Sequence, residues 1–153
     1  MRLLSIALVL LFTAGVAQAE CSPETVTIRD GETVLNFTVD VADTPRERSR
    51  GLMFVEDLPR QSGMLFVFDR PRAVTFWMKN TLIPLDMLFV DRTGVVRHIH
   101  HEAIPHDETQ IEGGDSVFAV LEINGGLARR YSLTVGAELR HPVFSDGPAA
   151  WPC

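Results

Sequence analysis

The side chains best suited to chemistry in this sequence lie close together in residues 76–86, FWMKNTLIPLD. Lys79 is the only lysine, since the other thirteen of the fourteen basic residues are arginines. An ammonium group is a compact charge whose pKa shifts readily on burial, whereas a guanidinium is a broad planar fork. A lysine at this one position indicates a site that an arginine would not fit. The neighbouring polar and aromatic side chains that could share such a site are those of Trp77, Asn80, Thr81 and Asp86.

We expect these side chains to bind a small ligand, because an indole, a cation, an amide and a carboxylate can together line a ligand pocket. In this hypothesis Lys79 supplies charge, Asn80 an orienting amide and Trp77 an apolar platform. Two alternatives stay open. Lys79 could act as a desolvated acid, base or nucleophile of an enzyme, with Asp86 as its partner. Alternatively, a buried Lys79–Asp86 ion pair could only fix the loop, with Trp77 packing in the core or at its rim.

A second cluster contains four of the five histidines, His98, His100, His101 and His106. On a regular strand His98, His100 and Glu102 would face the same way, which is a workable set of ligands for a transition metal. If the metal were copper, soft ligands could come from Met53, Met64, Met78 and Met87. The spacing matches no zinc signature, so histidines that are solvated or cap a loop are the alternative.

The remaining candidates are weaker. Arg70 and Arg72 flank a proline in a predicted turn and could clamp an anion, although a solvated turn explains them as well. Glu122 lies in an apolar strand, so it either faces outward or is a buried carboxylate paired with a cation. Glu122 and Asp86 together would suit a hydrolase, but the sequence has no G-x-S-x-G, H-E-x-x-H or phosphate-binding glycine loop. These missing motifs favour a non-enzymatic protein, for which we expect no cofactor.

The elements that must position these residues are short. Thr44, Pro45 and Glu47 form a capping box with proline at the first helical position, which predicts a helix that Gly51 ends. Alternating or continuous apolar runs predict strands at 25–29, 34–41, 64–68, 73–78, 87–90, 95–103, 117–123 and 137–140. We expect a turn at 69–72, a long loop at 105–116 and one or two helical turns at 127–131. This pattern predicts a mainly β fold: a small curled or closed, barrel-like antiparallel sheet with one or two short helices.

The two ends of the chain indicate export. Residues 1–19 have a basic start, an apolar run and a small-residue cleavage site, so we expect a signal peptide cut after Ala19 and a periplasmic or secreted protein. A retained N-terminal anchor is the alternative, including a lipid on Cys21, but Glu20 does not suit a lipoprotein signal. In an oxidising compartment Cys21 and Cys153 should form a disulfide, although free or intermolecularly paired cysteines are the alternative. We expect one β-rich domain at 20–145 and a C-terminal tail at 146–153.

The charge and the length of the apolar segments argue against two kinds of partner, nucleic acid and membrane. Removal of residues 1–19 takes away Arg2 and changes the formal net charge from −6 to −7. Without a basic run, the protein is not expected to bind nucleic acid. No later segment is long and apolar enough for a stable membrane span after signal cleavage. The expected partner is therefore a small molecule or a peptide.

Five blocks of the sequence resemble one known family, the uncharacterised conserved proteins called domain of unknown function 192. The blocks are GLMF (51–54), GMLFVF (63–68), FWMKNTLIPLDMLFVD (76–91), AVLEINGG (119–126) and VGAEL (135–139). The resemblance implies a compact, β-rich, barrel-like domain that is often exported, and it implies no activity. Together with the residues above, it favours an exported binding module for a small polar or anionic ligand or peptide. The alternatives are a hydrolase-like or lyase-like enzyme that uses Lys79 and Asp86, and a metal carrier that uses the histidines at 98–106.

Overall fold

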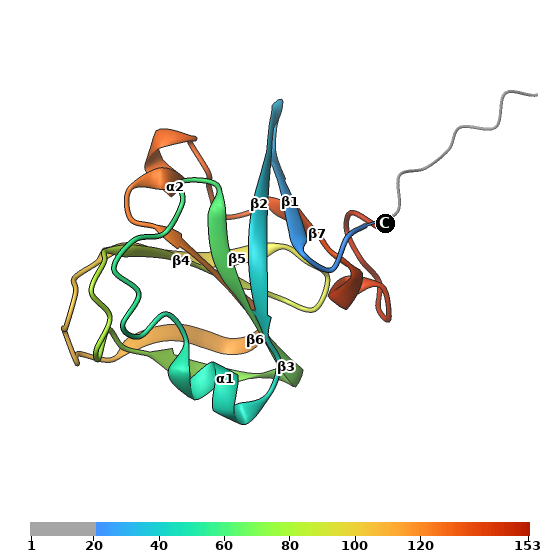
Figure 1. Ribbon diagram of the computed structural model, residues 1–153. Helices are drawn as coiled ribbons and strands as arrows, with labels where there is room; N and C mark the ends of the chain where they lie inside the picture. The colour runs from blue at the N-terminus through green and yellow to red at the C-terminus, as the bar shows by residue number, and fades with distance from the viewer. Residues whose placement is uncertain (1–20) are drawn as a thin grey trace, which may run out of the picture.

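The computed structural model describes residues 21–153, which form a mainly β fold with seven strands and two short helices (Figure 1). The strands lie in one sheet in the order β5-β4-β6-β3-β2-β1-β7. The elements in chain order are β1 (Thr25–Asp30), β2 (Thr33–Ala42), α1 (Pro45–Arg50), β3 (Ser62–Phe76), β4 (Leu85–Val90), β5 (Val96–Ala103), β6 (Ile111–Asn124), α2 (Leu127–Arg130), β7 (Glu138–Arg140) and a 3₁₀ helix (Pro142–Phe144).

The sheet curls until its two outermost strands meet. The N–H of Val96 at the start of β5 donates to the carbonyl of Ala137 at 2.8 Å, and the N–H of Leu139 in β7 donates to the carbonyl of Gly94 at 2.7 Å. The predicted curled sheet is therefore confirmed. One pairing differs from the antiparallel expectation, because β2 and β3 are parallel. The segment between them contains α1 and a loop, which gives the chain enough length to return to the same end of the sheet.

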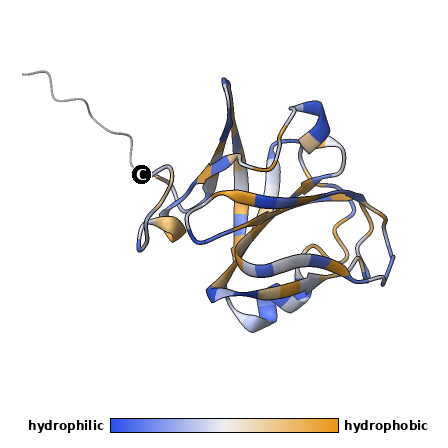
Figure 2. Cartoon of the chain, turned by 180° about the vertical axis from the view of Figure 1, so that it is seen from behind, coloured by the Kyte–Doolittle hydropathy of each residue, from blue (hydrophilic) through white to orange (hydrophobic). Residues whose placement is uncertain are grey.

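Curling divides the apolar side chains between two cores. The first core lies inside the curled sheet and takes side chains from every strand, from α2 and from Phe144 of the 3₁₀ helix. The second core lies on the opposite face of β3, β4 and β6 and includes Phe66, Met87 and Phe89. Strand β4 is buried along its whole length, as its continuous apolar sequence predicts. Figure 2 shows hydrophobic residues distributed along the strands, while α1 is hydrophilic.

Two expected loops prove to be strand. Residues 69–72 do not form a simple turn, because β3 continues through them with register shifts between Val67 and Thr75. Residues 105–116 are not all loop, because β6 begins at Ile111. A glycine-rich strand is required here, since a Cβ on Gly113 would lie 2.2 Å from the Phe89 ring. The polar sequence of both stretches reflects an exposed, bulged ribbon, and sequence alternation does not reveal such a ribbon.

The capping box at the start of α1 is confirmed. The N–H of Glu47 donates to the hydroxyl of Thr44 at 3.2 Å, and the N–H of Thr44 donates to the carboxylate of Glu47 at 3.0 Å. Hydrogen bonds to Thr44 are the main reason that the pKa of Glu47 is lowered. These contacts fix the first turn of α1 and so determine where its basic side chains lie.

The predicted disulfide between Cys21 and Cys153 is also confirmed, and Figure 1 shows the C-terminus beside the start of the described chain. The last residues pack on the domain. The indole of Trp151 lies between the guanidinium groups of Arg29 and Arg140, at 4.5 and 4.6 Å from its ring. The signal-peptide prediction falls on residues outside the described part of the chain. Between residues 21 and 153, no helix combines the length and the apolar character needed to cross a membrane.

Candidate functional site

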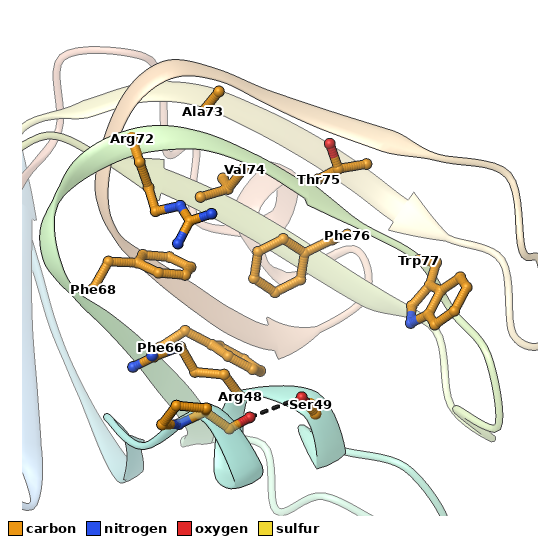
Figure 3. A pocket seen from close by; sticks show the side chains of 11 residues that line it. Arg48, Ser49, Phe66, Phe68, Arg72, Ala73, Val74, Thr75, Phe76 and Trp77 are labelled. Carbon is orange, nitrogen blue, oxygen red and sulfur yellow. Dashed lines mark hydrogen bonds between the residues drawn. The ribbon is translucent and has the colours of Figure 1, made fainter.

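A groove lies between the two halves of β3 and is bordered by α1 (Figure 3). Strand β3 bends between Phe68 and Val74, so its first half forms one wall of the groove and its second half the other. The groove encloses about 680 Å³, a volume in the usual range for small-molecule sites. Its lining consists of Pro45, Arg48, Ser49, Phe66, Phe68, Arg72, Ala73, Val74, Thr75, Phe76 and Trp77.

Aromatic rings supply most of the apolar surface of this groove. Phe66 and Phe76 pack edge to face with ring centroids 5.1 Å apart. Phe76 in turn contacts Phe89 of the second core at 5.8 Å, so the inner wall rests on a packed layer. Trp77 is 47% exposed and stands at the open end of the groove. Such rings offer flat, rigid faces to an apolar or aromatic ligand.

Arg48 provides a fixed positive charge beside these rings. Its guanidinium donates to the carbonyl of Val67 at 2.8 Å and also to the carbonyl of Asp43. It also lies 5.3 Å from the ring of Phe68, a cation–π distance. Because both carbonyls are neutral, these contacts orient the guanidinium without cancelling its charge.

Arg72 is the more available cation. It comes from the bend in β3, and its guanidinium points into the space between the two strand halves (Figure 3). Arg70 lines an adjoining hollow of about 650 Å³, which shares Arg48, Phe68 and Arg72 with the groove. Within residues 21–153, neither Arg70 nor Arg72 forms an ion pair. The groove therefore combines an aromatic floor with guanidinium groups whose charge is not neutralised.

Of the residues at 76–86 that were predicted to bind ligand, only Trp77 lines this groove, and it is joined there by Arg72, which was a weaker candidate for anion binding. The Nζ of Lys79 lies 5.1 Å from the ring of Trp77, and Lys79 forms an exposed ion pair with Glu108 at 3.9 Å. Neither alternative that pairs Lys79 with Asp86, catalytic or structural, has a contact to support it among residues 21–153. Asp86 is the second residue of β4 and is held by other donors.

Asn80 and Thr81 form a turn and not a pocket wall. Asn80 has a positive φ of 54°, and its carbonyl accepts a hydrogen bond from the N–H of Phe54 at 2.9 Å. Thr81 is buried, and its carbonyl accepts from the N–H of His106 at 3.2 Å. The two residues thus connect three loops, which is a structural role.

Asp86 is fully buried on the side of the first core. Its two carboxylate oxygens accept hydrogen bonds from the backbone N–H groups of Glu102 and Ala128, each at 2.7 Å. Both oxygens are occupied by backbone donors, so the arrangement anchors β4 to β5 and α2. It leaves no open position at which this carboxylate could meet a substrate.

The structure does not assemble His98, His100 and Glu102 into a metal site. A bulge in β5 inserts an extra residue between the pairs Met87–His100 and Leu85–Ala103, which breaks the regular alternation expected for these three residues, and Glu102 pairs with Arg129. His98 instead stacks on Phe89 at 5.4 Å. Burial, followed by the charges of His98 and His101, lowers the pKa of His100. Among the described residues, no group of three or more His, Cys, Asp or Glu side chains could hold a metal ion.

Glu122 is the carboxyl group in the most unusual environment. It is 4% exposed and faces the second core, and burial raises its pKa to about 8. From the sequence, Glu122 could either face outward or be buried and paired with a cation. The structure places Glu122 inside, and no cation of residues 21–153 pairs with it.

Sequence reasoning missed most of the groove. Nothing in the sequence distinguishes Arg48 from the other arginines of α1, or Phe66 and Phe76 from other apolar strand residues. They come together because β3 bends at 69–72, where a turn was expected. A cluster of Arg70 and Arg72 beside three phenylalanines was the one available signal.

Comparison with known proteins gives a consistent result. A family model described as DUF192, "Uncharacterized ACR", matches residues 26–141, which is more than half of the chain. A crystal structure from Sinorhizobium meliloti 1021, of a protein whose suggested role is transcription regulator, is similar with a TM-score of 0.75 and 37% identity, covering 80% of this chain and 96% of that chain. A crystal structure of a protein of unknown function from Novosphingobium aromaticivorans DSM 12444 has a TM-score of 0.73 and 38% identity, covering 84% and 97%. A comparison with curated proteins returned no match.

Proposed function

We propose, from the premise that this chain belongs to the DUF192 family of uncharacterized proteins, that it is a non-enzymatic binding module for a small amphipathic anion. The observation that carries this proposal is the groove in which Arg72 points into a space walled by phenylalanine rings. The ligand class is an organic acid with an apolar or aromatic body and one anionic group, such as a carboxylate.

The groove matches such a ligand in two respects. Burial of an apolar body against Phe68, Phe76 and Trp77 contributes about 25 cal/mol per Å² of apolar surface removed from water. A guanidinium presents paired N–H donors that fit a carboxylate in a bidentate manner, and hydrogen bonds to charged groups contribute about 1.5–3 kcal/mol each. Arg48, already oriented by two carbonyls, adds charge without a further loss of side-chain freedom.

The composition of the lining supports binding over catalysis. Its only side-chain hydroxyls are those of Ser49 and Thr75, and no histidine, cysteine or carboxylate lines this groove. The hydroxyl of Ser49 donates to the carbonyl of Pro45 at 2.7 Å, so it has no base to activate it. The hydrolase-like or lyase-like alternative relied on Lys79 and Asp86, which the fold keeps apart.

The test uses the fluorescent aromatic sulfonate 8-anilinonaphthalene-1-sulfonate as the probe, because it has the proposed chemistry. We expect saturable binding to the folded wild-type protein, competition by laurate or phenylacetate, and about tenfold weaker binding in Arg72→Met, which corresponds to about 1.4 kcal/mol. The matched controls are Arg130→Met, an exposed arginine on α2, and Lys79→Met, outside the groove; both should bind as wild type.

Two results would contradict the proposal. One is probe binding that Arg72→Met leaves unchanged while the melting temperatures of all variants agree. The other is loss of binding in Lys79→Met alone, which would return the site to the surface around Trp77 and Lys79. Melting curves without probe show that any loss of binding does not come from unfolding.

We further propose that the protein is exported to the periplasm or secreted. The signal-peptide pattern of residues 1–19 supports this, and so does the Cys21–Cys153 disulfide, because disulfides persist in oxidising compartments. The mass of the protein recovered from expressing cells tests it, with a mature chain beginning at Glu20 expected. Recovery of the full-length chain from the cytoplasm would contradict it.

The suggested role of the Sinorhizobium protein, transcription regulation, is not the function that we favour here. A DNA-binding surface requires clustered basic side chains that can neutralise phosphates. This chain is acidic, with fourteen basic against twenty acidic residues. Its charge therefore favours a small anion over a nucleic acid.

A further inference from the structure

The core methionines of the described chain all belong to the second core. The first core contains no methionine among its buried and packed residues, whereas the second contains Met64, Met78 and Met87. The fourth, Met53, has its sulfur 4.0 Å from the side-chain nitrogen of Asn80, two residues after Met78. Methionine is a common gap-filling residue, but its confinement to one core requires a local reason.

The sheet register places Glu122 between two of these thioethers. In the antiparallel pairs, Glu122 of β6 lies opposite Met64 of β3 on one side and opposite Met87 of β4 on the other. Directly opposite residues share a face of the sheet, with Cβ atoms about 4.5–5.5 Å apart. One carboxyl group is therefore flanked by one sulfur-bearing side chain on each side.

The carboxyl group of Glu122 forms no ion pair within the described chain. It is 4% exposed, and burial raises its pKa to about 8. A buried carboxylate is costly unless a cation or hydrogen-bond donors compensate it. The second core therefore contains one carboxyl group that could balance a positive charge, with a methionine opposite it on each neighbouring strand.

We propose that Glu122, Met64 and Met87 form a binding site for a soft monovalent metal ion, Cu(I). Thioethers select Cu(I) over harder divalent ions, which prefer oxygen and nitrogen ligands. A single positive charge also neutralises a single carboxylate, so the loaded site carries no net charge in its apolar surroundings. The disulfide removes the competing thiolate ligands, since the described residues contain no free cysteine.

The surrounding segment gives the site both cover and access. Val55 and Leu58 pack against the second core from a loop, and the side-chain amide of Asn124 donates to the carbonyls of Leu58 at 2.8 Å and Pro59 at 3.2 Å. Met64 is only partly buried, whereas Met87 is completely buried. Of the two methionines, Met64 is therefore the one in contact with solvent. This proposal is independent of the groove, because neither Glu122 nor Met87 lines it.

The experiment measures metal binding to the purified, disulfide-bonded protein. Cu(I) is generated anaerobically with ascorbate and competed with bicinchoninate, and Ag(I) serves as a redox-inert stand-in. We expect one equivalent of either ion to bind, and affinity to fall at least about tenfold in Glu122→Gln and in the double variant Met64→Leu/Met87→Leu. Leucine conserves the volume of methionine, and glutamine that of glutamate, so both variants should fold.

The controls separate this site from the histidines. Glu112→Gln changes an exposed glutamate of the same strand, and His98→Gln/His100→Gln removes one exposed and one half-buried imidazole of β5; both variants should bind as wild type. Three results would overturn the proposal: no binding to the wild type, binding that survives both Glu122→Gln and the double leucine variant, or binding lost only in the histidine variant. Circular dichroism checks that each variant is folded. If either Glu122→Gln or the double leucine variant is unfolded, the affinity of the remaining one tests the proposal.

Discussion

The carboxylate of Asp86 accepts a 2.7 Å hydrogen bond from the backbone N–H of Ala128, forty-two residues further along the chain. Its second oxygen accepts from the N–H of Glu102 at the bulge of β5, where φ is +50°. One buried side chain thus satisfies a donor at the start of α2 and another at an irregular strand position. Asp86 therefore fixes the geometry of three elements, and its chemistry is structural.

Replacement of Asp86 by alanine should destabilise the protein strongly. Asp86→Ala leaves two backbone N–H groups without acceptors, and each buried unsatisfied donor costs about 1–3 kcal/mol. We expect the free energy of unfolding in urea to fall by about 3 kcal/mol or more. The control Asp115→Ala, at an exposed position of β6, should change it by less than about 0.5 kcal/mol. Equal stability of the two variants would mean that Asp86 is dispensable for the fold.

His141 should make the free energy of unfolding depend on pH below about pH 6.5. Its Nδ1 accepts from the N–H of Val143 at 3.2 Å, so Nε2 carries the proton and donates to the carbonyl of Pro23 at 2.8 Å. Burial lowers the pKa of His141 below its ordinary value of 6.5, although the bond to Pro23 opposes this shift. The folded state therefore holds a neutral imidazole, whose contribution is fully present above pH 6.5 and is lost as the pH falls through the folded-state pKa.

The measurement is urea unfolding at a series of pH values between 5 and 8, for wild type and His141→Asn. Wild-type stability should fall below pH 6.5 by at most about 1.4 kcal/mol per pH unit from this group, and the variant should lack that component. The matched control is His106→Asn, at an exposed loop position with a φ of +64° that asparagine tolerates. A wild-type curve parallel to that of His141→Asn would exclude His141 as the source.

Removal of the Cys21–Cys153 disulfide should lower stability without changing the fold. The bond spans 132 residues, and constraint of so long a loop in the unfolded chain contributes about 5 kcal/mol in the chain-entropy model. Contacts of Trp151 with Arg29 and Arg140, and the hydrogen bond from the N–H of Ala150 to the carbonyl of Thr93 at 2.8 Å, hold the end in place without the bond. We expect Cys21→Ser/Cys153→Ser to fold with a lower melting temperature. An unchanged melting temperature on reduction of the wild type would contradict this expectation.

The sequence predicted well those features that depend on neighbouring residues. The capping box of Thr44 and Glu47, the hairpin of β1 and β2 and the fully buried strand β4 each follow from local spacing, because hydrogen bonds and side-chain alternation within a few residues decide them. The disulfide could also be predicted, since only two cysteines were available to pair.

The candidate site was predicted less well, because its parts meet only in three dimensions. The motif at 76–86 is a strand end followed by a turn. Its side chains end up in three different places: Trp77 at the rim of the groove, Lys79 on the surface and Asp86 in the first core. A single extra residue in β5 was enough to break the alternation that would have aligned Glu102 with His98 and His100, since side chains alternate with a period of two. No local sequence pattern predicts the bulge in β5.

The sequence by itself determined the class of fold, the short helices and the pairing of the chain ends, because alternation, capping and cysteine count are local or compositional. Tertiary structure alone decided that Asp86 faces backbone donors, that β3 bends to bring Arg72 over phenylalanine rings, and that Glu122 lies between Met64 and Met87. These relationships depend on sheet register and strand curvature. Both are set by packing between strands far apart in the chain, so no segment contains the information alone.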